Sequence, residues 1–536
     1  MSIVYFRLAI LVAVLSAVYI CLELLLKAQE ESTYIDTAIN GNRRSPPHVV
    51  FILVDDLGYN DVGYNAKLHG SAIRTPNIDK LASHGVILDN YYVHKVCTPT
   101  RAQLLTGRYP IRYGLQHHVI EVSQPSCLPS DEVTLAEELQ DVGYSTHAVG
   151  KWHLGFYKED CLPTNRGFET FFGMYSSTMD HYTYLRHDTF HQKVVGLDLH
   201  NDTVQSFDPA WDGSGHYSTE LLTREAQKVI KRHTTIEKPL FLYLSYMAIH
   251  DPIQVPERYK EPYKDIIANE QRLTLAGMIN SLDEGVGNLT ETLKESGLYD
   301  NTIIIFSTDN GGSVQHSGNN WPFRGSKDTL YEGGVRGVGF IHSPLLPDQI
   351  KGTTSHAWIH VTDWFPTILS GLAGGDTNLT KAIDGIDVWK AIISNSTSPR
   401  KELLHSIDPI SYIEPILPGR AALRMGDWKL LLGNMCLFRH GSTGSVDTIN
   451  CAWYPPKESN LTFISPEEPR DKEIWLFNIA RDPLEKHDLA SRRPGIVKRM
   501  MGRLRVYNET AVPPWYPPRD PNSNPKYNGG VWGPWE

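Results

Sequence analysis

The stretch His48-Val-Val-Phe-Ile-Leu-Val54, which runs directly into Asp55-Asp56, decides the predicted fold. It is short and apolar and has little polar alternation, which is typical of a strand buried in a parallel sheet. Three further runs have the same character, at residues 143–149, 239–245 and 302–307. Helical patterns separate the runs, at residues 134–142 and 219–233. Strands that alternate with helices predict an α/β fold with a sheet covered on both faces.

Polar side chains lie just beyond the carboxyl end of each of these runs. They are Asp55 and Asp56, then Lys151 and His153, then His250, and finally Asp309 and Asn310. Any single case is explained by a turn, because Asp and Asn are common turn residues. Four cases with complementary chemistry instead favour one site, since open α/β sheets bind ligands beyond the carboxyl ends of their strands.

The composition is that of a large globular protein. The chain has 536 residues, of which 41% are hydrophobic and 21% charged, so a disordered or fibrous chain is excluded. Lys and Arg number 51 against 61 Asp and Glu, which gives a net charge of −10. This balance argues against binding to nucleic acid or to an anionic membrane, but it is compatible with a local basic pocket.

Residues 1–27 predict entry into the secretory pathway. Arg7 precedes an apolar run at residues 8–22, which Glu23 ends, and this pattern is typical of a signal peptide. A signal anchor is the alternative, because residues 24–26 prolong the run toward spanning length. Residues 28–46 are then a linker. Sequons for N-glycosylation agree with entry into the secretory pathway, and they lie at Asn201, Asn288, Asn378, Asn395, Asn460 and Asn508.

The number of cysteines leaves one thiol without a disulfide partner. One of the six cysteines falls in the signal region, so five remain for an oxidising compartment. Four cysteines can pair in three ways, and the compact choices are Cys127 with Cys161 and Cys436 with Cys451. Cys97 is then the odd one. An odd thiol in a secreted protein requires an explanation.

A smaller unit is predicted after residue 390. Linker-like sequence near that position divides the chain into a large domain at 47–390 and a smaller one at 391–536. Residues 420–432 and 473–478 resemble strands of an antiparallel sheet. The tail at 512–536 is rich in Pro, Trp and Tyr, and we expect it to form an extended strap over the fold.

The acidic groups at the strand ends predict a metal site. Asp55, Asp56, Asp309 and Asn310 offer only hard oxygen ligands, which suit calcium or magnesium, whereas zinc would favour His or Cys. Adjacent acids also repel each other unless a metal cation or cationic side chains neutralise them.

The motif Cys97-Thr-Pro-Thr-Arg101 predicts an oxyanion site. Pro99 suits the first turn of a helix that continues toward Thr106. The amino terminus of a helix attracts an oxyanion, and the planar fork of Arg101 suits the oxygens of phosphate or sulfate. A lone Cys is more often a small buried apolar residue. Its place beside Arg at a helix start argues against that reading here.

The motif Cys-x-Pro-x-Arg resembles the sulfatase signature, whose Cys is oxidised to formylglycine. The stretch Gly143-Tyr-Ser-Thr-His-Ala-Val-Gly-Lys-Trp-His153 resembles the second signature of the same family. The similarity runs from about His48 to the end of the chain, and residues 306–312, 332–340 and 530–535 resemble the arylsulfatase B group in particular. The resemblance implies an alkaline-phosphatase-like fold, with a large mixed, mostly parallel sheet between helices and a smaller carboxyl-terminal antiparallel sheet.

The resemblance implies two cofactors. One is calcium, whose ligands match Asp55, Asp56, Asp309, Asn310 and the modified Cys97. The other is formylglycine, which a formylglycine-generating enzyme makes from Cys97 during maturation. We expect the hydrated aldehyde to supply one hydroxyl that attacks sulfur and a second that expels sulfate.

The resemblance also implies roles for five basic side chains. Arg101 and Lys151 match residues that hold and neutralise the sulfate and the aldehyde hydrate. His153 matches the residue bonded to the formylglycine hydroxyl. His250 and Lys327 match the residues that face the bridging ester oxygen of the bound substrate. Cations offset the charge of the transferred group, and an imidazole can donate a proton to the leaving alcohol.

The sequence departs from the family pattern in three respects. Thr100 stands where the family usually has Ser, a conservative change that should still permit oxidation of Cys97. The set of cysteines is smaller than that expected of the vertebrate enzyme, and residues 180–212 resemble the family less closely. Loops at that position shape the sugar pocket, so the reaction type is better determined than the substrate.

Together these features predict a calcium-dependent sulfatase of the lysosome or the extracellular space. The resemblance alone implies the substrate, the 4-sulfate of N-acetylgalactosamine in chondroitin or dermatan sulfate, and another sulfated sugar is the alternative. A phosphoesterase of the same fold would need a Ser or Thr nucleophile and extra Asp and His ligands for a second metal. A catalytically silent glycan-binding homologue would have lost a motif residue, and all are present.

Overall fold

The computed structural model describes residues 46–188, 193–410, 419–433, 438–440, 446–449, 451–459, 461–462, 464–466 and 472–536. The predicted signal segment, all but the last residue of the linker, Cys436 and Asn460 lie outside the described residues. Within the described ranges, no helix is both long enough and apolar enough to cross a membrane.

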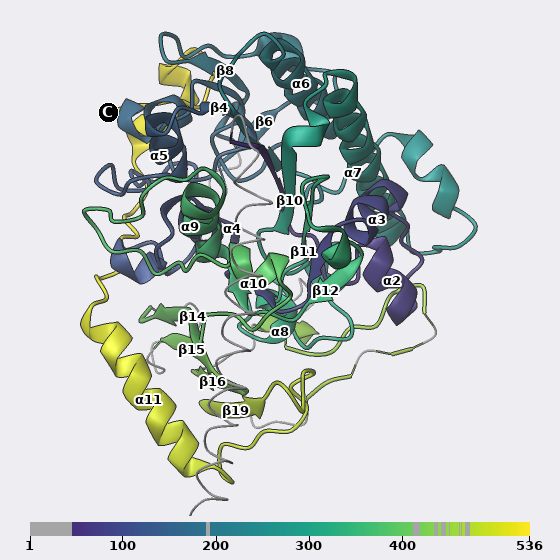
Figure 1. Cartoon of the computed structure of the whole chain (residues 1–536), viewed down its shortest axis with the longest axis vertical. Coiled ribbons are helices and arrows are strands. Elements are labelled where there is room, and N and C mark those ends of the chain that lie inside the picture. Colours follow the sequence, from purple (N-terminus) through teal and green to yellow (C-terminus); the bar gives the residue numbers. More distant parts are fainter. Residues whose placement is uncertain are drawn as a thin grey trace, which may run out of the picture. The chain divides into compact units, whose positions relative to one another are not determined.

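A nine-stranded sheet contains all four predicted strands (Figure 1). In spatial order its strands are β12 (Thr353–Ser355), β2 (Val86–Leu88), β11 (Gly339–His342), β10 (Thr302–Thr308), β1 (His48–Val54), β9 (Leu240–Tyr246), β4 (Ser145–Lys151), β5 (Thr170–Met174) and β8 (His200–Thr203). The consecutive strands from β10 to β5 run parallel, whereas β11 and β8 are antiparallel to their neighbours. The predicted α/β fold with a mixed, mostly parallel sheet is therefore confirmed.

Helices cover both faces of this sheet (Figure 1). On one face lie α3 (Pro76–Ser83), α6 (Ser218–His233) and α7 (Glu270–Glu295), and on the other α4 (Cys97–Thr106), α5 (Leu135–Asp141) and α9 (Trp364–Pro366). Val50 and Ile52 of β1 belong to the apolar core beneath α6 and α7. Phe51 points the other way and packs edge-on against Trp364, with ring centroids 6.0 Å apart. This burial on both sides explains why β1 is a continuous apolar run.

A separate four-stranded antiparallel sheet follows in the chain. Its strands, in spatial order, are β14 (Glu402–Asp408), β15 (Arg420–Met425), β16 (Trp428–Leu432) and β19 (Ile474–Asn478), and α11 (Pro494–Glu509) packs on β15 (Figure 1). The predicted antiparallel strands at 420–432 and 473–478 are confirmed as β15, β16 and β19. The domain boundary near residue 390 stays a prediction.

The remaining elements are short. The strands are β3 (Tyr91–Tyr92), β6 (Leu185–His187), β7 (Val195–Leu197), β13 (Ile359–His360), β17 (Phe438–His440) and β18 (Val446–Ile449). The helices are α2 (Gly63–His69), α8 (Glu332–Val335) and α10 (Trp389–Ile393). Of these, α8 and β3 adjoin the four-stranded sheet, since Tyr92 and Val335 share an apolar cluster with Leu431 of β16.

The tail at 512–536 runs back along earlier segments of the chain. Backbone N–H groups of Val512 and Trp515 donate to Ile111 and Gly114, each over 2.8 Å, and Trp532 N–H donates to the carbonyl of Leu197 over 2.8 Å. The Trp532 side chain is fully buried. The tail therefore contacts segments that lie several hundred residues earlier in the chain.

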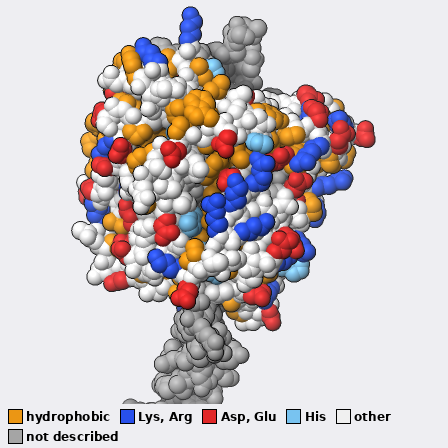
Figure 2. Space-filling view, turned by 90° about the horizontal axis from the view of Figure 1, so that it is seen from above, with side chains coloured by type: hydrophobic (Ala, Val, Ile, Leu, Met, Phe, Trp, Pro, Cys, Tyr) orange, Lys and Arg blue, Asp and Glu red, His pale blue; other side chains and the backbone are white. Residues whose placement is uncertain are grey.

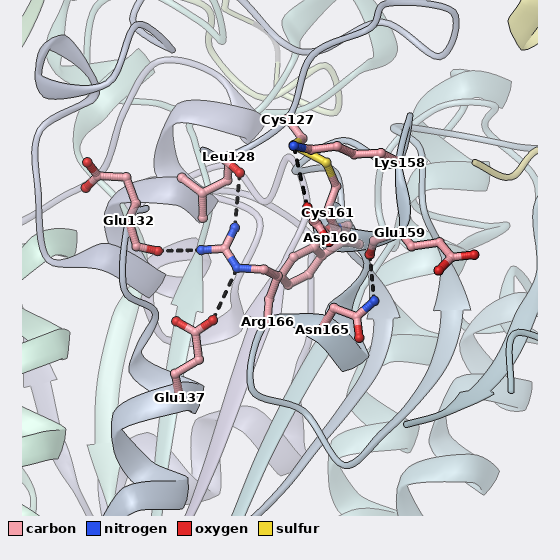
Figure 3. The surroundings of a disulfide bond; sticks show 11 residues. Cys127, Leu128, Glu132, Glu137, Lys158, Glu159, Asp160, Cys161, Asn165 and Arg166 are labelled. Atoms are coloured by element: carbon pink, nitrogen blue, oxygen red, sulfur yellow. Dashed lines mark hydrogen bonds and ion pairs between the residues drawn. A yellow bond between two sulfur atoms is a disulfide. The ribbon is translucent and has the colours of Figure 1, made fainter. Parts of the chain in front are cut away.

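A disulfide joins Cys127 to Cys161, as predicted (Figure 3). Beside it, the Arg166 guanidinium donates to the carbonyls of Leu128 and Glu132 and pairs with Glu137 (Figure 3). Leu128 N–H donates to Leu154 O over 2.8 Å, and Trp152 Nε1 donates to Cys161 O over 3.0 Å. The disulfide therefore stabilises the segment after β4. The predicted pairing of Cys436 with Cys451 stays a prediction, because Cys436 is not described.

The charged side chains are not spread evenly over the surface. Figure 2 shows Lys and Arg side chains gathered in an oblique band across one face, close to an apolar patch. The net charge of −10 therefore describes the chain as a whole and not each face.

Candidate active site

The carboxyl ends of β1 and β10 place four predicted residues together. The two strands are parallel neighbours, with Val54 opposite Thr308, so the residues that follow them meet at one edge of the sheet. These residues are Asp55, Asp56, Asp309 and Asn310, and at most 3% of each is exposed. The backbone N–H of Asp56 donates to Asp309 Oδ1 over 3.2 Å.

Cys97 faces this acidic group from the first position of α4. Its Sγ lies 3.4 Å from Asp55 Oδ1 and 3.4 Å from Asn310 Oδ1, and only 1% of the residue is exposed. Among the described residues, Cys97 is the free cysteine. The predicted helix start at this motif is confirmed, with Pro99 in the first turn.

Three cationic side chains balance the three carboxylates. Arg101 Nη2 lies 2.8 Å from Asp309 Oδ2, Lys151 Nζ lies 2.5 Å from Asp55 Oδ2, and Lys327 Nζ lies 2.6 Å from Asp56 Oδ1. Each pair joins residues more than ninety positions apart. Cationic side chains, one of the two sources expected from the sequence, thus neutralise the adjacent acids.

The charges around Cys97 disfavour its thiolate. Burial raises the pKa of the Cys97 thiol well above its usual value, and the carboxylates of Asp309 and Asp55 raise it further, against the opposing effect of Lys151 and Lys327. A thiol is a much weaker nucleophile than a thiolate. Unmodified Cys97 is therefore poorly suited to attack a substrate.

The site also contains two buried histidines. His153 Nε2 lies 3.2 Å from the carbonyl oxygen of Ile120, so this nitrogen carries the proton and Nδ1 is an acceptor in the neutral ring. His153 Nδ1 has no hydrogen-bond partner among the described residues. Burial, Lys151 and Arg101 hold the pKa of His153 well below its usual value. The ring is therefore a neutral acceptor beside α4, where Thr98 Oγ1 donates to His153 O.

His250 follows β9, and its imidazole lies close to both Asp56 and Cys97. Its Nδ1 donates to the Asp251 carbonyl over 2.8 Å, and its Nε2 lies 3.8 Å from Asp56 Oδ2. Burial and the charges of Lys327 and Lys151 hold the pKa of His250 well below its usual value. The imidazole is therefore neutral in this structure.

The donor atoms fit a hard cation. Ligand atoms of Asp55, Asp56, Cys97 and His250 lie within 4.8 Å of one another, the one such group in the described part of the chain. Asp55 Oδ1 and Asn310 Oδ1 both lie beside Cys97, and all these oxygens are buried. Buried carboxylate and amide oxygens suit calcium or magnesium. In this structure, Asp309 pairs with Arg101.

The structure adds residues that sequence reasoning missed. Ser245 Oγ accepts from Arg101 Nη1 over 2.5 Å, and therefore helps to orient that guanidinium. Asp251 and Asp328 stand directly after His250 and Lys327 and are partly exposed. The sequence held a weak signal for the two aspartates, because an acid directly follows each of two predicted catalytic residues, His250 and Lys327. Ser245 had no signal beyond its place at the end of an apolar run.

Three site residues adopt left-handed backbone conformations, with φ of 61° at Asp56, 55° at His153 and 72° at Asp328. Such conformations are uncommon for residues other than glycine and cluster at functional sites. Their occurrence around one cluster supports the view that the backbone here is selected for the placement of side chains.

Comparisons with known proteins agree with this geometry. The sequence profile of the sulfatase family matches residues 47–374. Arylsulfatase J of the mouse (Mus musculus) is 48% identical over 92% of this chain and 80% of its own length. N-acetylgalactosamine-6-sulfatase of the dog (Canis lupus familiaris) is 26% identical over 87% of each chain. The crystal structure of Ps i-CgsB in complex with k-i-k-neocarrahexaose has a TM-score of 0.71 and 28% identity, and covers 90% of this chain and 98% of that one.

The profile match covers more than half of the chain, and the ten predicted site residues meet at one edge of the sheet. The chain therefore belongs to the sulfatase family and is an enzyme that hydrolyses sulfate esters.

Proposed function

We propose that the chain hydrolyses the 4-sulfate of N-acetylgalactosamine in chondroitin and dermatan sulfate, with formylglycine made from Cys97 as its nucleophile and calcium as its metal ion. One observation supports the mechanism above others. The free thiol of Cys97 is buried among three carboxylates and three cations, at the start of a helix.

Modification explains why a cysteine stands at this position. The surrounding carboxylates raise the pKa of Cys97, so the thiol itself is a poor nucleophile. Oxidised and hydrated Cys97 would supply one hydroxyl to attack sulfur and a second to release sulfate. His153 Nδ1, an unpaired acceptor in the described residues, suits the role of accepting a proton from one of these hydroxyls.

The cations suit the transferred group. Arg101, Lys151 and Lys327 are already ordered by Asp309, Asp55 and Asp56, so they need little reorganisation when a sulfate binds. The three acids and three cations cancel in charge. A divalent cation would therefore leave the cluster positive overall, which favours an anionic ester.

The metal would be held by Asp55, Asp56, Asp309 and Asn310, together with modified Cys97. Bound calcium would act as a Lewis acid on a sulfate oxygen. For Asp309 to serve as a ligand, it must share its carboxylate between the metal and Arg101, and a carboxylate has two oxygens for this purpose.

His250 and Lys327 are assigned to the leaving-group side of the site. Both contact Asp56, and both retain partial exposure, 11% for the His250 side chain and 14% for that of Lys327. His250 holds its Nδ1 proton on Asp251 O, which leaves Nε2 as the nitrogen that can carry a proton to the ester oxygen. A bound sulfate brings the negative charge that favours protonation of the ring.

A sugar substrate is supported by the relatives. One relative is named as an N-acetylgalactosamine-6-sulfatase, and the related Ps i-CgsB was crystallised with a neocarrahexaose. The choice of the 4-sulfate rests on the resemblance to the arylsulfatase B group. A different sulfated sugar is the second candidate, because the 48% identical relative is named only as an arylsulfatase.

The place of action is proposed to be the lysosome or the extracellular space, reached through a cleaved signal or with the N-terminal segment as an anchor. The asparagines of all five described sequons are exposed, at Asn201, Asn288, Asn378, Asn395 and Asn508. This exposure suits acceptors of glycans.

Sulfate release from defined saccharides tests the proposal. The purified full-length chain is incubated with oligosaccharides that end in N-acetylgalactosamine 4-sulfate, N-acetylgalactosamine 6-sulfate or N-acetylglucosamine 6-sulfate, and with nitrocatechol sulfate. The proposal predicts release from the 4-sulfate and from the aryl ester. Release from one of the other sugars alone would overturn the substrate assignment, and no release from any compound would indicate a silent homologue.

A further inference from the structure

Two aspartates lie beside the groups assigned to the leaving-group side. Lys327 Nζ is 2.6 Å from Asp56 Oδ1, and His250 Nε2 is 3.8 Å from Asp56 Oδ2, so the two basic side chains flank one carboxylate. An aspartate follows each of these residues in the chain, Asp251 after His250 and Asp328 after Lys327. Asp251 Oδ1 lies 3.2 Å from His250 Nδ1, and the charge of Asp328 acts on Lys327, so both aspartates lie next to the leaving-group side.

Each aspartate has a histidine partner from another segment. Asp251 Oδ1 lies 3.3 Å from His316 Nδ1, and Asp328 Oδ1 lies 3.8 Å from His118 Nε2. The four side chains are between 28% and 37% exposed, whereas the side chain of Asp56 is 4% exposed. We call these four residues the rim pairs.

Stability does not explain the rim pairs. Partly exposed contacts between a carboxylate and an imidazole contribute little to folding, because water screens them and two side chains must be ordered. Asp328 also has φ of 72°, a conformation that costs free energy for a residue with a Cβ. The backbone N–H of Asp328 donates to Lys95 O over 3.0 Å, which holds the residue in this conformation. A costly conformation beside a reactive site points to a role in binding.

We propose that the rim pairs form a subsite for neutral hydroxyl groups on either side of the scissile sulfate. This inference rests on the proposed function and specifies which rings the site accepts. Carboxylates accept strong hydrogen bonds from sugar hydroxyls. The same carboxylates repel a second anionic group placed at that position, so they also select against competing substrates.

The subsite therefore selects a ring with a single sulfate. In a terminal N-acetylgalactosamine 4-sulfate, hydroxyls at C3 and C6 stand on either side of the sulfate. A 4,6-disulfate replaces one of these hydroxyls with an anion. The rim pairs thus favour monosulfated rings over disulfated ones.

The test compares Asp328→Asn and Asp251→Asn with the native full-length enzyme. Asn keeps the shape of the side chain and removes its charge. We expect the preference for the 4-sulfate over the 4,6-disulfate, measured as a ratio of kcat/KM values, to fall by about tenfold in each variant. We also expect kcat/KM for the 4-sulfate to fall more than kcat/KM for nitrocatechol sulfate, which has no sugar hydroxyls.

Asp89→Asn is the matched control. Asp89 also pairs with a histidine, His356, over 3.1 Å, and its side chain is 30% exposed, although it has a second partner in Arg336 over 3.1 Å. It follows β2, three strands away from β1 in the large sheet. The control should change the ratio by less than about twofold, because surface charges far from a site have small effects.

Two results would overturn the inference. One is an unchanged ratio in both rim variants while the native enzyme turns over all three substrates. The other is an equal loss on the sugar and aryl substrates, which would show that the aspartates only orient His250 and Lys327. If the native enzyme hydrolyses nitrocatechol sulfate but neither sugar, the proposed substrate fails instead.

Discussion

Two buried clusters of charged side chains in this molecule have different consequences. The catalytic cluster contains Asp55, Asp56, Asp309, Arg101, Lys151 and Lys327. The second cluster, the α8–β16 triad, contains Glu332, Lys429 and Glu485, with Lys429 Nζ 2.8 Å from Glu332 Oε1 and 2.9 Å from Glu485 Oε1.

The two clusters differ in their exposure to solvent and in the group that they surround. The Glu332 and Lys429 side chains of the triad are 0% exposed, and the triad joins α8 to β16. The catalytic cluster retains exposure at His250 and Lys327 and surrounds a thiol. A cluster of buried charges therefore indicates a contact that stabilises the fold as readily as it indicates an active site. An active site differs in being open to a ligand and in having a reactive atom at its centre.

Removal of the central sulfur should have the largest effect on turnover. We expect Cys97→Ala to lower kcat for nitrocatechol sulfate by at least about 10⁴-fold, because the nucleophile is lost. Thermal unfolding should change little. In the triad, Lys429→Ala should do the reverse and destabilise the fold at pH 8 by about 3–5 kcal/mol, since two buried carboxylates lose their cation. Residual activity of Cys97→Ala near the native level would break the distinction between the clusters.

Removal of the metal ion should have the second largest effect on turnover. Exhaustive chelation is expected to abolish sulfate release, and added calcium should restore it in the native chain. Asp309→Ala should stay inactive with calcium and lose about 3–5 kcal/mol of stability, because the buried Arg101 loses its nearer carboxylate and keeps only the longer contact with Asp55. Full activity after chelation, together with full activity of Asp309→Ala, would show that catalysis does not require the metal.

His250→Ala should separate two kinds of substrate. Hydrolysis of a sugar sulfate is expected to slow by about 10²–10⁴-fold, because its alcohol needs a proton as it leaves. Nitrocatechol sulfate should lose much less, since its leaving group is stable as an anion. Steady-state rates on both substrates check the prediction. Equal losses would remove His250 from the acid role.

The smallest effect is expected in the triad and depends on pH. Burial raises the pKa of Glu485 from 4.5 to about 7, and Glu332 adds to the rise, against Lys429. The native state thus keeps a proton that the unfolded chain loses. The stability from this proton is fully present below pH 4.5 and is lost as the pH rises through about 7.

Glu485→Gln imitates the protonated acid. At pH 8 the variant should therefore be more stable than the native chain by about 1–3 kcal/mol, and at pH 5 the two should agree closely. Denaturant unfolding at both pH values measures this, and sulfatase activity should be retained. A variant that is less stable than the native chain at pH 8 would show that folding does not raise the pKa of Glu485.

Prediction from sequence succeeded where local pattern and sheet geometry coincide. The run His48–Val54 is β1 itself, and parallel strands bring their carboxyl ends together, so Asp55 and Asp309 could be placed at one site. The disulfide of Cys127 and Cys161 followed from short spacing in the chain.

Contacts between distant segments could not be predicted in the same way. The pair of His118 and Asp328 joins segments about two hundred residues apart, and no local period marks it. The pairing of Lys327 with Asp56 likewise depends on a loop whose path the sequence does not encode locally. Helix α11 was also missed, because few of its residues are buried and its apolar pattern is weak.

The mass of the tryptic peptide at residues 96–101 tests the central claim most directly. Trypsin cleaves after Lys95 and Arg101, so this short peptide carries Cys97. In active, secreted protein we predict the mass of an aldehyde in place of the thiol, with the sulfur lost, and a shift on reaction with a carbonyl reagent. An unmodified thiol at Cys97 in protein that hydrolyses sulfate esters would contradict the account.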